Sequence, residues 1–137
     1  MGGQESDFKS FWLSTHFIIK WFEAKMLCTS YGMEFASFES VEELNYFAAN
    51  VSHSGLFKTY TFISGITKTL KSSTEWFWVE SGKKIDYFIQ FDSGEPSGGQ
   101  HELCLGFIKR PNGIFFHDVD CSNGIQGQVL CQSRESA

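Results

Sequence analysis

Apolar residues near the start of the chain recur at the spacing of a helix. Five of them share one helix face: Trp21, Ala24, Leu27, Cys28 and Tyr31. Gly32 follows directly and is a natural C-terminal stop. We therefore expect a helix here, with the sulfur of Cys28 directed into the core. Short strands or turns are expected on either side of it, over residues 11–13, 17–19 and 35–37.

A second helix is predicted to begin at Ser40. Residues 40–43 form a capping-box sequence, in which the Ser40 hydroxyl accepts from the N–H of Glu43 and the Glu43 carboxylate reaches back to the cap. Five apolar residues give the expected buried stripe: Val41, Leu44, Phe47, Ala48 and Val51. The triplet Asn50-Val51-Ser52 at the end of this helix is an N-glycosylation acceptor sequence, with Asn50 as the modified residue.

After residue 55 the hydrophobic period changes to two, which is typical of strands. Five strands are predicted, over residues 59–66, 76–80, 103–109, 113–117 and 128–132. Turn-forming residues lie between them. In the second of these strands, Trp76 and Trp78 are expected on the core face and Phe77 on the other face. Two helices followed by antiparallel strands predict an α+β domain.

The cysteines indicate in which cellular compartment the protein folds. Four of them, at positions 28, 104, 121 and 131, are an even number in a chain of 137 residues. This usage predicts a disulfide framework and a secreted protein. Four cysteines allow three pairings, and their spacing does not choose among them. No two have C-x-x-C spacing, which argues against a structural zinc site.

The charge of the chain and its lack of long apolar runs argue against some classes of binding partner. The net charge of −5 argues against nucleic acid or an anionic membrane as partner, since both attract basic proteins. No apolar run is long enough to span a bilayer, so no membrane insertion is expected. The first six residues match the N-myristoylation pattern, but they also fit the remnant of an expression vector before a mature secreted chain. The disulfide framework favours the second interpretation.

The length corresponds to one domain. We expect a flexible N-terminal segment over residues 1–7, a domain over 8–134 and a tail over 135–137. Because residues 1–9 are polar and contain glycine, the start of the chain is expected to be frayed as far as Lys9.

Acidic residues gather near the last three cysteines. Five lie between positions 92 and 120: Asp92, Glu95, Glu102, Asp118 and Asp120. A bridge between Cys104 and Cys121 would bring Glu102 and Asp118 together, as an oxygen-rich ligand set for calcium. The alternative is that each acid is simply solvated. An acid/base pair for glycoside hydrolysis would need an apolar pocket that these polar loops do not supply, so no enzyme is expected.

Taken together, these residues resemble a C-type lectin-like domain, most closely the secreted single-domain lectins of arthropods. The resemblance covers residues 8–134 and includes the helix at 21–28 with the sequence Gly-Met-Glu-Phe-Ala-Ser-Phe-Glu-Ser at 32–40. It continues through Phe62-Ile63-Ser64-Gly65, Trp76-Phe77-Trp78, Gly94-Glu95-Pro96, Glu102-Leu103-Cys104, the Phe-His-Asp-Val-Asp-Cys sequence at 116–121, and Cys131.

The resemblance implies a fold with two helices, two small antiparallel sheets and a long ligand-binding loop. It implies two disulfides, Cys28–Cys131 and Cys104–Cys121. It also implies a calcium ion in the long loop that binds sugar hydroxyls directly. The implied metal and sugar ligands are Glu95, Ser97, Glu102, His117 and Asp118, with Pro96 as a cis residue.

Two of these five positions depart from the pattern of the resembled family. Ser97 stands in place of Asn or Asp, and its hydroxyl is a poorer calcium ligand. His117 stands in place of Asn, and imidazole suits zinc better than calcium. We therefore expect a weakened calcium site or a relic of one, with zinc as an alternative metal. The auxiliary calcium site is expected to be lost, because Lys68, Gly98 and Leu103 replace acidic ligands there.

The resemblance implies a secreted lectin for mannose- or fucose-type glycans that acts in pattern recognition in innate immunity. Binding at one site is expected to be weak and to become useful through multivalency on a surface polysaccharide. The alternative is a calcium-independent protein-binding module with a protein partner, because one fold hosts many functions.

Overall fold

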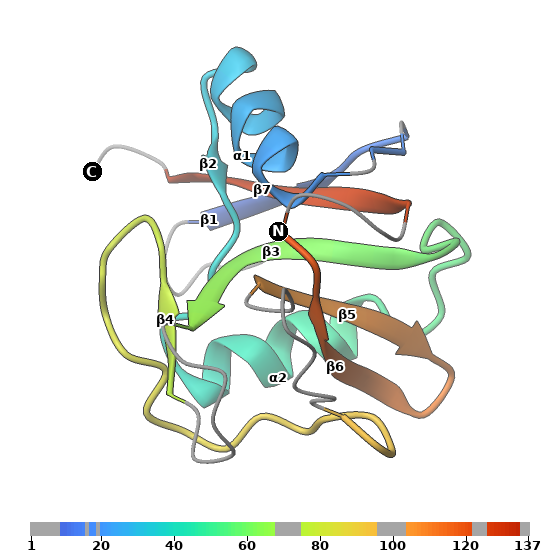
Figure 1. Cartoon of the computed structure of the whole chain (residues 1–137). Helices are drawn as coiled ribbons and strands as arrows, with labels where there is room; N and C mark the ends of the chain where they lie inside the picture. Colours follow the sequence, from blue (N-terminus) through green and yellow to red (C-terminus); the bar gives the residue numbers. More distant parts are fainter. Residues whose placement is uncertain are drawn as a thin grey trace.

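A computed structural model describes residues 9–15, 17–18, 20–67, 75–95, 104–121 and 126–134 of the chain. Within them lie two helices and seven strands (Figure 1). In chain order these are β1 (Lys9–Leu13), α1 (Trp21–Ser30), β2 (Glu34–Phe35), α2 (Val41–Asn50), β3 (Tyr60–Thr67), β4 (Trp76–Trp78), β5 (Cys104–Arg110), β6 (Gly113–Val119) and β7 (Gly127–Arg134). Each of the five strands predicted after residue 55 is present, with ends within two residues of the prediction.

The strands form two antiparallel sets that share one connected sheet. In the first set, β7 pairs with β1 and β2. In the second, β3 pairs with β4 and β5, and β5 pairs with β6. A parallel pairing of β3 with β7 joins the two sets, giving the order β1-β7-β3-β5-β6. The family resemblance implied two antiparallel sheets but not this parallel junction.

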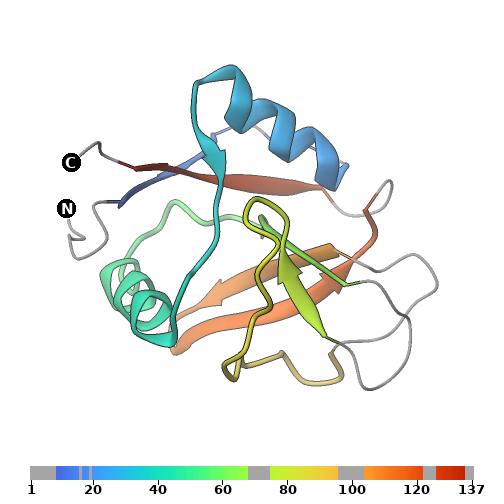
Figure 2. The ribbon, with the colours of Figure 1, turned by 90° about the vertical axis from the view of Figure 1, so that its left-hand side faces the viewer.

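Two clusters of buried side chains form the core, on opposite sides of the central strands. One lies between α2 and the strands and includes Phe47, Trp78 and Phe116. The other lies under α1 and includes Trp21 and Val129. Figures 1 and 2 show α1 on one side of β7 and α2 on the far side of β3. Each fully buried Phe stabilises the fold by about 1.5–3 kcal/mol.

The alternation predicted for β4 is confirmed. Trp76 is 7% exposed and Trp78 is 3% exposed, and both belong to the core cluster under α2. Phe77 between them is only partly buried, as expected when successive side chains leave opposite faces of a strand.

Both implied disulfides are present. The Cys28–Cys131 bond ties the fully buried Cys28 of α1 to β7. The Cys104–Cys121 bond ties the start of β5 to the second residue after β6. β1 runs antiparallel to β7 from Lys9 opposite Arg134 to Leu13 opposite Leu130. The two ends of the described chain therefore lie side by side.

The prediction for the first helix is wrong at its last residue. Tyr31 was expected on the buried face, but it is 57% exposed and follows the helix as its C-cap. There the backbone has left the helical conformation, and the Tyr31 ring lies 5.3 Å from that of Trp12. Gly32 adopts a φ of 72°, which explains why a glycine ends this helix.

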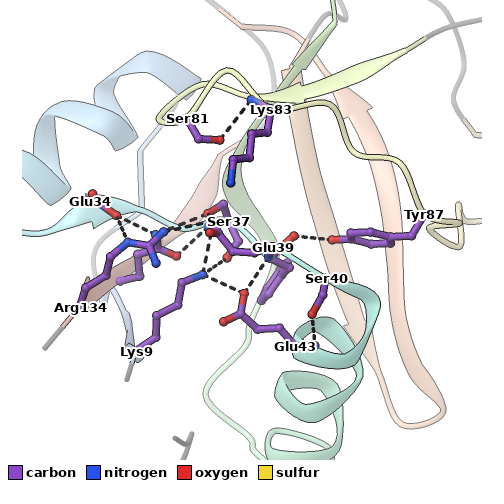
Figure 3. Close-up of polar contacts among 12 residues, drawn as sticks. Lys9, Glu34, Ser37, Glu39, Ser40, Glu43, Ser81, Lys83, Tyr87 and Arg134 are labelled. Carbon is purple, nitrogen blue, oxygen red and sulfur yellow. Dashed lines mark hydrogen bonds and ion pairs between the residues drawn. The ribbon is translucent and has the colours of Figure 1, made fainter. Parts of the chain in front are cut away.

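The start of β1 also differs from the prediction, because Lys9 is buried rather than frayed. A group of polar side chains surrounds it, which we call the Lys9 cluster: Lys9, Glu34, Ser37, Glu39, Glu43, Gln132 and Arg134 (Figure 3). The Lys9 Nζ donates to Ser37 O at 2.7 Å and to Glu43 Oε1 at 2.9 Å. These contacts join β1 to α2, which explains why the polar start of the strand is ordered.

The capping box at α2 is modified by the same cluster. The Ser40 hydroxyl accepts from Glu43 N at 3.1 Å, as predicted. The Glu43 carboxylate, expected to reach back to the cap, instead accepts from the N–H of Glu39, one residue earlier, at 2.7 Å. Lys9 accounts for this difference, because its Nζ also donates to Glu43 Oε1.

Arg134, at the end of β7, closes the cluster on its exposed side. It donates to Glu34 Oε1 and to Glu39 Oε2, both at 3.1 Å. Burial alone would raise the pKa of Glu39, but the charge of Lys9, the Ser37 hydroxyl and Arg134 outweigh it and lower that pKa. Burial lowers the pKa of Lys9, with Glu43 acting in the opposite direction.

Candidate functional site

Residues 90–95, which precede part of the predicted ligand set, lie along strand β6. Asp92 N donates to Phe116 O at 3.0 Å, and Phe116 N donates to Gln90 O at 2.8 Å. In Figure 1 this segment belongs to the yellow stretch that runs along the lower side of the domain. These bonds place the acids of the segment next to the side chains on one face of β6.

His117 is the β6 residue that meets these acids. Its Nε2 lies 3.0 Å from Asp92 Oδ2, and its Nδ1 lies 3.6 Å from Glu95 Oε2. The side chains are partly buried, at 12% exposure for His117 and 19% for each acid. The edge of the imidazole also lies against the Tyr60 ring, with centroids 5.0 Å apart.

Arg110, at the end of β5, supplies a positive group. Its Nη2 donates to the same Asp92 Oδ2 that His117 contacts, and its guanidinium lies over the Phe115 ring. Hydrogen bonds from Arg110 and then from His117 lower the pKa of Asp92. Burial, followed by the charges of Glu95 and Asp92, raises the pKa of Tyr60. We call this group the Asp92 cluster: Tyr60, Asp92, Glu95, Arg110 and His117.

The turn after Asp92 is fixed by hydrogen bonds to that residue. The Ser93 N–H donates to Asp92 Oδ1 at 3.1 Å, and the Glu95 N–H donates to Asp92 O at 2.9 Å. Gly94 adopts a φ of 81°, a conformation that favours glycine. Asp92 therefore uses Oδ1 and its carbonyl to hold the turn that carries Glu95, while Oδ2 contacts Arg110 and His117.

The structure brings together two of the five predicted ligand residues. Glu95 and His117 meet as described, whereas Asp118 lies opposite the fully buried Leu105 and is itself 5% exposed. Successive residues of a strand point to opposite faces, so Asp118 leaves β6 on the face away from His117. Ser97, Glu102 and Pro96 lie outside the described residues, as do Lys68, Gly98 and Leu103 of the expected auxiliary site.

Sequence reasoning missed Arg110 and Tyr60, and named Asp92 only as one of the nearby acids. Arg110 lies 18 positions from Asp92, and no motif links them. The only available signal was the expected hairpin of β5 and β6, which places Arg110 near the start of β6. Asn50, the acceptor residue, is exposed at the end of α2, where its Nδ2 donates to Tyr46 O at 2.9 Å.

The described residues do not fit the implied calcium ion. An ionised Asp92 can only accept hydrogen bonds, so the nearby Nε2 of His117 carries its proton and offers no lone pair to a metal. Calcium prefers oxygen ligands with a net negative charge, whereas this cluster contains a guanidinium. In the part of the chain that the structure describes, no three His, Cys, Asp or Glu side chains are arranged to hold a metal ion.

Comparison with solved structures gives matches over almost the whole chain. The carbohydrate-recognition domain of the mouse scavenger receptor C-type lectin is 21% identical, with a TM-score of 0.71, over 98% of this chain and 95% of that one. The C-type lectin CEL-I from Cucumaria echinata is 18% identical, with a TM-score of 0.72, over 97% and 95%.

A third similar structure has a different described property. A calcium-independent type II antifreeze protein is 18% identical, with a TM-score of 0.68, over 96% of this chain and 90% of that one. No protein-family model and no curated protein matches the sequence. A particular closeness to arthropod lectins stays a prediction. The matched structures, the strand order and the two disulfides together show that this chain has the C-type lectin-like fold.

Proposed function

We propose that this protein is an extracellular carbohydrate-binding module that recognises glycans with the Asp92 cluster. The supporting observation is the convergence of acceptors, donors and an aromatic ring at one partly exposed place. Sugar hydroxyls both donate and accept hydrogen bonds, so carboxylates beside a guanidinium suit them. Arg110 is 47% exposed, which leaves part of its guanidinium accessible to a ligand.

The extracellular location is supported by the two disulfides, which persist in oxidising compartments. The described residues contain no helix that is long and apolar enough to cross a membrane. Mannose- and fucose-type sugars are the first ligands to test, because Glu95 keeps the first position of the turn that the family resemblance associates with them. Weak single sites would favour a multivalent polysaccharide, as in the recognition of microbial surfaces by innate immunity.

A glycan array probed with the biotinylated chain on streptavidin tests this proposal. We expect retention of mannose- or fucose-containing glycans, and loss of that retention in Asp92→Asn. Asp86→Asn is the matched control, since it removes the same charge from an exposed position outside the Asp92 cluster. Equal retention by the two variants, or no retained glycan on any feature, would contradict the proposal.

The second candidate function is protein binding, and the outer face of α1 favours it. Phe22 and Met26 lie one turn apart on that face and are 48% and 69% exposed. Exposed apolar pairs of this kind occur at protein contacts. Replacing both by Ser would remove a protein partner captured there but would leave retention on the glycan array unchanged.

A further inference from the structure

The Asp92 cluster contains its own hydrogen-bond donors, one of them the Arg110 guanidinium, and they occupy contacts that a metal ion would need. Arg110 Nη2 and His117 Nε2 meet at a single atom, Asp92 Oδ2. Asp92 Oδ1 is used by the N–H of Ser93. Both carboxylate oxygens of Asp92 are therefore engaged within the protein.

The second acid of the cluster is held by the same arrangement. Glu95 Oε2 faces the remaining ring nitrogen of His117 at 3.6 Å, and the Glu95 N–H donates to the carbonyl of Asp92. His117 is placed by its position on β6, opposite Gly106 of β5. The position of Glu95 is thus determined by contacts to Asp92 and to the sheet.

We propose that Arg110 and His117 take the role that calcium would have at this end of the fold, so that residues 90–95 stay docked on β6 and the site functions without calcium. Arg110 is charged at all accessible pH values, so its contribution does not depend on a dissolved ion. For calcium to bind Asp92, the contacts of Arg110 and His117 with Asp92 would have to break. The statement about glycan binding rests on the proposed function, whereas the statement about docking of the segment does not.

The first test is thermal unfolding of the unmodified chain in millimolar calcium and in chelator. We expect equal melting temperatures within error. If calcium bound, a free calcium concentration of ten times the dissociation constant would raise the melting temperature by roughly 3–6 °C in a domain of this size. A rise of that order would overturn the proposal.

The second test measures whether Arg110 holds the segment, by hydrogen exchange of the Asp92 and Glu95 amides in chelator. Arg110→Gln should speed their exchange by about tenfold, the effect of losing one charge-assisted hydrogen bond. Lys83→Gln is the control, because it removes the same charge from an exposed side chain outside the cluster. Unchanged exchange in Arg110→Gln would overturn the role given to Arg110.

The third test asks whether these two groups keep calcium out. The double variant Arg110→Gln, His117→Asn removes the guanidinium and supplies an amide oxygen at position 117. It should gain a rise in melting temperature with calcium that the unmodified chain lacks. If the double variant stays insensitive to calcium, the two groups are not what excludes the ion.

The proposal and the proposed function can fail separately. If no glycan binds while the three results above are obtained, the proposed function is wrong and the docking of residues 90–95 stands. If glycan retention requires calcium, the glycan function stands and the present inference is wrong.

Discussion

The Lys9 cluster and the Asp92 cluster differ in their access to water. In the Lys9 cluster, the side chains of Lys9 and Glu43 are 2% and 6% exposed. In the Asp92 cluster, Arg110 is 47% exposed and Asp92 is 19% exposed. Paired charges alone therefore do not identify a functional site, since the buried cluster joins secondary structure elements while the exposed one leaves donors and acceptors for a ligand.

The two clusters also differ in what they connect. The Lys9 cluster joins both chain ends, through β1 and β7, to the start of α2 (Figure 3). The Asp92 cluster joins a loop segment to the hairpin of β5 and β6. Loss of the first should affect the stability of the whole domain. Loss of the second should affect only its own region and the binding of a ligand.

The largest losses of unfolding free energy are expected from removing the two disulfides. The Cys28–Cys131 bond closes a separation of 103 residues and lies next to the Lys9 cluster on β7, and its removal should cost about 4–5 kcal/mol of unfolding free energy. The Cys104–Cys121 bond closes a separation of 17, and its removal should cost about 3 kcal/mol. Urea denaturation of paired Cys→Ala variants measures both, and a reversed order would contradict this view.

The next effect is the loss of the buried ion pair. Lys9→Met should reduce the unfolding free energy by about 3–5 kcal/mol, because it leaves the Glu43 carboxylate buried without its cation. Adding Glu43→Gln should recover much of this loss, since the amide oxygen can still accept from Glu39 N without a charge. Lys83→Met, at an exposed position, should stay within about 0.5 kcal/mol of the unmodified chain. Equal losses for Lys9→Met and Lys83→Met would show that Lys9 is not buried.

A smaller effect should appear in the pH dependence of stability. The folded protein lowers the pKa of Glu39 below its ordinary value of 4.5, so ionised Glu39 stabilises the fold above that pH. This contribution should be lost as the pH falls through the folded pKa. Glu39→Gln should therefore melt at a lower temperature near neutral pH, and the difference should disappear in acid. Melting curves recorded between about pH 7 and pH 2 measure this difference. The prediction is wrong if the two melting temperatures differ by the same amount at every pH.

The smallest effect on global stability is expected in the Asp92 cluster. Arg110→Gln removes a half-exposed ion pair, and such pairs contribute little to the stability of a whole domain. Its urea midpoint should match that of Lys83→Gln, even though local exchange at residues 90–95 becomes faster. A large fall in the urea midpoint would mean that the Asp92 cluster, like the Lys9 cluster, stabilises the whole domain.

Local signals in the sequence were sufficient for much of the fold. The Ser40 cap lies three residues from its partner, and the Trp76 and Trp78 alternation lies within three residues. Physical rules that act over a few residues therefore predicted these features. The two cysteine pairings came from the family resemblance alone.

The contacts that distinguish this chain act over longer separations. Lys9 meets Glu43 across 34 positions and Arg110 meets Asp92 across 18, and neither pair belongs to a motif. The ligand list from the resemblance placed Glu95 and His117 together but could not indicate that His117 donates to Asp92. The parallel junction of β3 with β7 was also missed, because strand periodicity contains no information on which strands pair.

The most direct test of the difference between the clusters is an NMR titration of the ¹⁵N-labelled chain with oligomannose in the presence of chelator. We predict shifts of amide resonances in residues 90–95 and in β6, with those of β1 and α2 unchanged. Shifts confined to α1, or shifts at the Asp92 cluster that appear only after calcium is added, would contradict the account.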